Sequence, residues 1–160
     1  MIKTFRGLLQ TGEENKIRLS TKKGKIGYRI KSLEIFPEKP GAAGVYYESV
    51  VQIYKIKQTA IDAVVDFADG NLLAAAMFGS DTATHAFYGP TITVFDEEVF
   101  NQDIYICNSD IQADAGMNYM LKLETFVQTD NQAAVSTLRD IRLNPHREDS
   151  NATCVSGCWL

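Results

Sequence analysis

The fold is decided by the stretch Asn118-Tyr119-Met120-Leu121-Lys122-Leu123-Glu124-Thr125-Phe126-Val127. Its alternation predicts a strand that is buried on one face and partly covered on the other. The predicted buried face carries Tyr119, Leu121, Leu123 and Val127, and the opposite face carries Lys122 and Glu124 beside Met120 and Phe126.

A short helix is predicted directly after this strand. Thr129-Asp130-Asn131-Gln132 is typical of a capping box, because the Thr129 hydroxyl can accept from a backbone N–H while Gln132 reaches back. Val135, Leu138 and Ile141 follow at helical spacing, which is enough to dock one helix face on a sheet. The sequence therefore predicts a helix from about Thr129 to Arg142.

The chain before residue 118 predicts short strands separated by turns. The alternation of apolar and polar residues, together with β-branched and aromatic content, indicates each strand. The predicted strands are Lys3–Leu9 at an edge, Ile17–Ser20, Tyr28–Phe36 with a bulge near Ser32, Ser49–Ile56 at the centre of a sheet, Thr91–Phe95 and Ile104–Cys107. The predicted turns and loops are Thr11–Lys16, Pro37–Gly44, Gly79–Pro90 and Asn108–Gly116.

The segment Thr59–Phe78 is consistent with two structures. The alanine content of Ala60–Val65 and Leu72–Phe78 is compatible with helices. Asp69-Gly70 between two apolar runs is also a hairpin signal, and we predict a hairpin of Val64–Phe67 against Leu72–Phe78.

Together these elements predict an all-β fold. About eight or nine strands separated by turns favour an antiparallel β-sandwich of jelly-roll type with one short C-terminal helix. We expect this domain to span residues 1–143, and residues 144–160 to form a polar tail or arm.

Composition limits the partners of the chain. It has 160 residues, 45% hydrophobic and 22% charged, with a net charge of -4, so a sizeable core is expected and a nucleic-acid partner is not. The basic cluster Lys22–Lys25 fits a solvated hairpin tip better than a phosphate contact. We expect no signal peptide and no membrane segment, and therefore a reducing, cytosol-like compartment.

The residues that carry chemistry are sparse. The three cysteines Cys107, Cys154 and Cys158 argue against a disulfide framework, and Cys107 is expected to be a buried free thiol. His85 and His146 are the only histidines, too few for a jelly-roll metal centre. Asp66–Asn71 resembles part of a calcium loop but fits turn chemistry better. We expect no catalytic site, no cofactor and no metal.

Aromatic residues at loop ends are the candidate contacts. Tyr46 and Tyr47 follow one predicted loop, and Phe87 and Tyr88 lie within another. Exposed aromatics in such places suit contacts with proteins or glycans, although aromatics in strands are more often core. Trp159 lies in the apolar end of the tail, which either buries it on a neighbouring subunit or another protein, or is a functionless end.

Several segments resemble small structural proteins of the virions of marine tailed bacteriophages. The resemblance covers most of residues 1–141 and omits the cysteine-containing tail. It is carried by Met1–Gly7, Gly27–Ile30, Ser49–Lys55, Val65–Ala76, Phe100–Tyr105 and Asn118–Arg142.

The resemblance implies a capsid cement or decoration protein, or another head or neck component. It implies a non-enzymatic homo-oligomer assembled into the virion in the host cytoplasm, with the major capsid protein or another virion protein as its partner. The alternative is a glycan- or receptor-binding module of a phage tail or fibre. Beyond the tail, the expected contacts are the Pro37–Gly44 loop with Tyr46 and Tyr47, and the loop with Phe87 and Tyr88.

Overall fold

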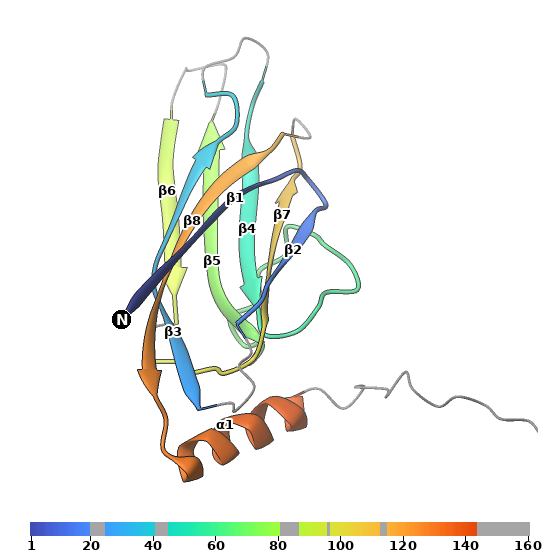
Figure 1. Ribbon diagram of the computed structural model, residues 1–160. Helices are drawn as coiled ribbons and strands as arrows, with labels where there is room; N and C mark the ends of the chain where they lie inside the picture. The colour runs from blue at the N-terminus through green and yellow to red at the C-terminus, as the bar shows by residue number, and fades with distance from the viewer. Residues whose placement is uncertain (20–24, 41–44, 81–86, 96, 113–114, 144–160) are drawn as a thin grey trace, which may run out of the picture.

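The computed structural model describes residues 1–19, 25–40, 45–80, 87–95, 97–112 and 115–143 (Figure 1). Within these residues the chain forms eight strands and one helix. The elements are β1 (Ile2–Leu9), β2 (Glu14–Ile17), β3 (Ile26–Pro37), β4 (Glu48–Tyr54), β5 (Leu72–Ser80), β6 (Phe87–Val94), β7 (Ile104–Asp110), β8 (Met117–Val127) and α1 (Asp130–Leu143).

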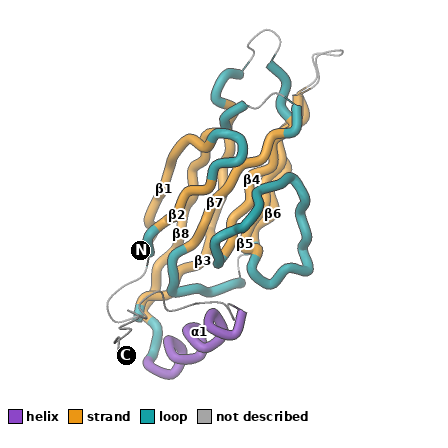
Figure 2. The backbone as a smooth tube through the Cα atoms, turned by 90° about the vertical axis from the view of Figure 1, so that its right-hand side faces the viewer, coloured by secondary structure: helices purple, strands orange, loops and turns teal. Residues whose placement is uncertain are grey.

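The strands form two antiparallel sheets. The three-stranded sheet has the order β1-β8-β3, and the five-stranded sheet has the order β2-β7-β4-β5-β6. The two sheets lie one over the other as two layers (Figure 2). The prediction of an antiparallel all-β fold with one short C-terminal helix is therefore confirmed.

One core fills the space between the sheets. Both layers contribute alternate residues to it, as expected when each sheet buries one face. The three-stranded sheet provides Leu9, Tyr28, Ile30, Leu33, Ile35, Met117, Tyr119, Leu121 and Leu123, and the five-stranded sheet provides Ile17, Val51, Ile53, Leu73, Ala74, Ala76, Phe78, Ile104 and Ile106. The strand read from residues 118–127 is β8, which lies at the centre of the three-stranded sheet.

The bulge predicted near Ser32 is present in β3. The register of β3 against β8 shifts between Ile30 and Ser32, because Leu123 faces Ile30 while Lys122 faces Ser32. Tyr28 and Ile30 on one side of the bulge and Leu33 and Ile35 on the other all enter the same core. In a regular strand these two pairs would point to opposite faces of the sheet. The extra residue of the bulge turns both pairs towards the core.

The predicted hairpin of Val64–Phe67 against Leu72–Phe78 is wrong. Leu72–Ser80 is strand β5, but its partners are β4 and β6, and Val64–Phe67 belongs to the loop between β4 and β5. The strand predicted at Ile17–Ser20 lies earlier, at Glu14–Ile17, and β6 begins within the predicted Gly79–Pro90 loop.

The capping box of α1 is confirmed. The Thr129 backbone N–H donates to Gln132 Oε1 at 3.1 Å, and the Gln132 backbone N–H donates to Thr129 Oγ1 at 3.4 Å. These two bonds satisfy donors that a helix start leaves free.

The predicted docking face of the helix is wrong. Val135 and Leu138 are 65% and 55% exposed, and the Ile141 side chain lies outside the described residues. The helix docks instead through small polar side chains. Asn101 Nδ2 donates to Thr137 Oγ1 at 3.1 Å, and Gln128 Nε2 donates to Ser136 Oγ at 3.2 Å. Val127, predicted to be buried, is 82% exposed at the end of β8.

The search for membrane-spanning helices found none among the described residues. Their one helix, α1, has 14 residues.

Candidate functional site

The sheets have two distinct ends. Because every pairing is antiparallel, β1, β3, β5 and β7 finish at the end where β2, β4, β6 and β8 start. Four inter-strand connections therefore begin and end there, and we call this the loop end; its described residues are 10–13, 38–40, 45–47, 111–112 and 115–116 (Figure 1). Helix α1 lies at the opposite end.

The structure divides the four predicted aromatic contacts at the loop end. Tyr47 is 3% exposed, and its ring packs edge-on against Phe78 with centroids 5.8 Å apart. Its backbone N–H donates to Ser80 Oγ at 3.1 Å. Tyr47 is therefore a core residue, which removes its ring from the surface, whereas Tyr46 beside it is partly exposed.

Phe87 and Tyr88 are brought beside this position by their backbones. They pair with Ser80 and Gly79 in the ladder of β6 and β5, so the two predicted contact segments lie at one end of the fold. The side chains of Phe87 and Tyr88, and all of Trp159, lie outside the described residues.

A hydrogen-bond network centred on the buried Asp110 holds the loop end together, and no local pattern in the sequence predicts it. The buried Ser49 hydroxyl donates to the Asp110 carboxylate, 61 residues away along the chain. The Gln112 backbone N–H donates to Asp110 Oδ1 at 2.8 Å, and Gln112 Nε2 donates to Glu48 Oε2 at 3.0 Å. Ile111, between these polar groups, is 60% exposed. The loop end therefore offers an exposed apolar side chain beside the partly exposed carboxylate of Glu48, while Asp110 is buried.

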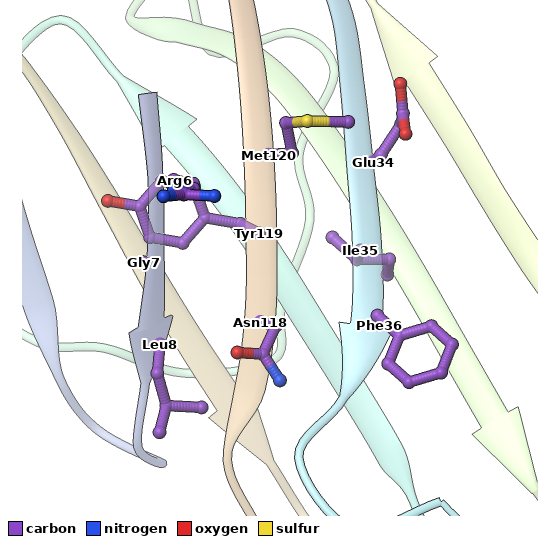
Figure 3. A pocket seen from close by; sticks show the side chains of 9 residues that line it. All are labelled: Arg6, Gly7, Leu8, Glu34, Ile35, Phe36, Asn118, Tyr119 and Met120. Carbon is purple, nitrogen blue, oxygen red and sulfur yellow. The ribbon is translucent and has the colours of Figure 1, made fainter. Parts of the chain in front are cut away.

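A second candidate surface is the outer face of the three-stranded sheet. It carries a shallow groove of about 600 Å³, lined by residues of all three strands (Figure 3). Phe36 on β3 is 61% exposed and Leu8 on β1 is 38% exposed. Large apolar side chains on a strand face indicate a contact surface when they gather in one place.

A glycine in β1 makes room for Tyr119 in the core beneath this groove. Gly7 faces Tyr119 across the β1–β8 ladder, and a Cβ on Gly7 would lie 2.9 Å from Cε1 and from the hydroxyl oxygen of Tyr119. The Tyr119 ring therefore occupies space that any other residue at position 7 would fill. Burial of this ring, aided by the charge of Glu13, raises the pKa of Tyr119 above its ordinary value.

The outer face of the five-stranded sheet is covered by residues 55–71, which we call the covering loop. Ile61 and Val65 of this loop pack on Tyr54, Leu72 and Cys107. Gln52, which is 3% exposed, fastens the loop through Nε2, which donates to the Val64 carbonyl at 3.0 Å and to the Asp62 carbonyl at 3.4 Å. Gln52 Oε1 accepts from the Tyr54 hydroxyl at 2.6 Å.

Cys107 is a buried free thiol, as predicted. Burial, with a smaller contribution from the Glu14 charge, raises the pKa of Cys107 to about 12. Tyr54 lies beside it under the covering loop, and burial raises its pKa to about 12 as well, with added effects of Cys107 and the carboxylates of Asp69 and Asp62. Both groups therefore stay protonated at neutral pH, which suits packing rather than nucleophilic chemistry.

Asp66–Asn71 is a pair of turns, as predicted. Asp66 Oδ1 accepts from the Ala68 N–H, and Asp69 Oδ1 accepts from the Asn71 N–H, both at 2.8 Å. In the part of the chain that the structure describes, no three His, Cys, Asp or Glu side chains are grouped to hold a metal ion. The histidines His85 and His146, and the cysteines Cys154 and Cys158, lie outside that part.

Comparison of the chain with protein-family models, with curated proteins and with solved structures found no match.

Proposed function

We propose that the two sheets are wound as a jelly roll. Rolling up an eight-stranded antiparallel ribbon pairs the first strand with the eighth, the second with the seventh, the third with the sixth and the fourth with the fifth. Three of these pairs occur as ladders, namely β1 with β8, β2 with β7, and β4 with β5. Strand β6 contacts β3 but is laddered to β5, which is the one departure from this scheme.

We further propose that this protein is a non-enzymatic structural component of a tailed-phage virion, a cement or decoration protein that binds between capsid subunits. The single observation that carries the proposal is the strand order, because jelly rolls with this winding are a recurrent architecture of viral coat proteins. The resemblance of the sequence to small virion proteins supports it further.

The contact surface in this proposal is the loop end. Tyr46 and Ile111 supply apolar area, and the partly exposed Glu48 supplies a carboxylate at its edge. An interface of this composition, with an apolar centre and a polar rim, is typical of protein–protein contacts. The partner surface would be basic.

The alternative function is a glycan- or receptor-binding module of a tail or fibre. Lectin domains also use the jelly-roll architecture. The observation that favours it is the partly exposed Tyr46, two residues from Glu48, since an aromatic face beside carboxylates suits a sugar ring and its hydroxyls.

The test begins with virions collected from the source of this sequence and labelled with an antibody against the chain. Label on the outside of heads supports the decoration role, and label at tail tips supports the alternative. Particles without label would reject both.

Binding of the purified chain to heads stripped of it then tests the loop end. We expect Ile111→Asp, at a position 60% exposed on the loop end, to reduce co-sedimentation at least tenfold. Leu138→Asp is the matched control, because Leu138 is 55% exposed on α1 at the opposite end. Equal binding by the two variants would contradict the assignment of the loop end.

A further inference from the structure

We propose that the outer face of the three-stranded sheet docks a second copy of this chain, which forms a two-fold dimer with its axis along β8. This dimer is independent of the proposed capsid role, because it uses a different surface.

Two rows of outward side chains cross the groove from β1 through β8 to β3. Arg6 and Glu34 both face Met120, with Arg6 on one side of it and Glu34 on the other. Leu8 and Phe36 flank Asn118 in the same way (Figure 3). The β1 side of the groove therefore carries a positive charge and the smaller apolar side chain, Leu8. The β3 side carries a negative charge and the larger apolar side chain, Phe36.

This arrangement is complementary to itself. A two-fold axis along β8 exchanges the β1 side of one copy with the β3 side of the other. Arg6 then lies opposite Glu34 of the second copy, twice per dimer, and Leu8 lies opposite Phe36. Met120, on the axis, meets its own counterpart. A two-fold interface needs such self-complementarity, because the same patch serves both copies.

The charges of the single chain leave Arg6 available for this contact. Arg6 is exposed and has no ion-pair partner among the described residues. Glu34 is already paired with Lys122, whose Nζ lies 2.9 Å from Glu34 Oε1, and the Glu34 side chain remains 52% exposed. Glu34 in the dimer would therefore lie between its own Lys122 and the second copy's arginine. The Lys122 side chains of the two copies face each other near the axis, and each keeps its neutralising Glu34.

The size of the face predicts weak association. Three strands about 4.8 Å apart and about eight residues long cover about 14 Å by 27 Å, which gives about 400 Å² on each copy. The total of about 800 Å² is below the roughly 1,200 Å² of stable interfaces. We expect a reversible dimer with a dissociation constant between about 10 μM and about 1 mM.

The first experiment is sedimentation equilibrium of the full chain between about 5 μM and about 2 mM. We expect the average mass to rise from 17.8 kDa towards twice that value. A mass that stays at 17.8 kDa across this range would overturn the proposal.

Charge reversal identifies the face. Arg6→Glu and Glu34→Arg each place like charges opposite one another, and we expect each to weaken the dimer at least tenfold. The double variant Arg6→Glu/Glu34→Arg restores both attractive pairs between the copies and should dimerise more tightly than either single variant. It should stay weaker than the natural chain, because Lys122 loses its own Glu34 partner. A mixture of the two single variants should form a heterodimer, because one copy supplies two carboxylates and the other two guanidinium groups.

Arg18→Glu is the matched control, because Arg18 is exposed but lies outside this sheet. Circular dichroism confirms that each variant is folded. A dimer that Arg18→Glu and Arg6→Glu weaken equally, or that the double variant fails to restore, would assign the contact to another face.

Discussion

Replacing Gln52 with glutamate should destabilise the fold in a pH-dependent way. The side chain is 3% exposed, and its amide group donates to the Val64 and Asp62 carbonyls of the covering loop. A carboxylate of the same shape would bring a negative charge against two carbonyl oxygens in a site with little water. Burial and the lost donors would raise the pKa of the new glutamate above its ordinary value.

The magnitude follows from burial of the charge. Leaving a charged carboxylate buried without a partner costs about 3 kcal/mol at pH 7. Loss of one well-made hydrogen bond adds about 1 kcal/mol, so the free energy of unfolding should fall by about 4 kcal/mol. Between the two pKa values the folded variant binds more protons than the unfolded chain, so its stability falls as pH rises. At pH 4 the acid is mostly protonated in both states, and only about 1 kcal/mol should remain.

The assay is urea unfolding followed by far-ultraviolet circular dichroism, with Gln52→Glu and the natural chain compared at pH 4 and pH 7. Gln132→Glu is the matched control, because Gln132 Oε1 accepts the Thr129 N–H at a helix start. A carboxylate accepts that bond equally well and is favoured by the helix dipole, so we expect no loss of stability at pH 7. A Gln52→Glu variant that matches the natural chain at pH 7, or shows the same deficit at pH 4, would refute the role given to Gln52.

Three further predictions concern other parts of the fold. Cys107 should resist iodoacetamide at pH 8 until the chain is unfolded, because a pKa of about 12 leaves about one thiol in ten thousand ionised; peptide mass spectrometry separates it from the other cysteines. Gly7→Val should cost about 1–3 kcal/mol by displacing the Tyr119 ring, and Tyr119→Leu in the same chain should recover part of that loss in thermal unfolding. Thr129→Ala should cost about 1 kcal/mol of helix stability, seen as faster amide exchange in the first turn of α1.

Local chemistry made parts of the fold predictable. The bulge in β3 could be predicted because two buried pairs of opposite parity, Tyr28 with Ile30 and Leu33 with Ile35, can share a core only if one residue is inserted. The helix start could be predicted because both members of its capping box lie within four residues. In each case the residues that decide the structure lie close together along the chain.

The failures involve partners that are distant in sequence. The Asp69-Gly70 signal suggested that Val64–Phe67 pairs with β5, but the ladder positions on β5 are taken by β4 and β6. The apolar segment that contains Val64 and Val65 therefore forms no strand with β5 and packs on the outer face of the five-stranded sheet. Helical periodicity likewise showed that an apolar stripe exists on α1, but it could not show that polar Ser136 and Thr137 make the contacts.

The candidate surfaces were only partly predictable for the same reason. The sequence placed Tyr46 and Phe87 in or beside predicted loops. That both loops lie at the same end of the fold follows only from the strand order. The groove residues Leu8, Phe36 and Met120 come from three strands whose pairing no local pattern specifies. Arg6 and Glu34 become a complementary pair only when the register is known.

The two proposed surfaces reinforce each other through the direction of the dimer axis. Because the axis runs along β8, parallel to the strands, both loop ends of a dimer point the same way. A repeating surface such as a capsid could then engage both loop ends together, and the second contact would form at the millimolar effective concentration of a linked site. A weak dimer whose loop ends each bind weakly would then attach firmly to a repeating capsid surface, but only weakly to a single capsid subunit. The Arg6→Glu variant should accordingly lose affinity for whole heads while keeping its affinity for an isolated capsid subunit, a difference that a purely monomeric decoration protein would not show.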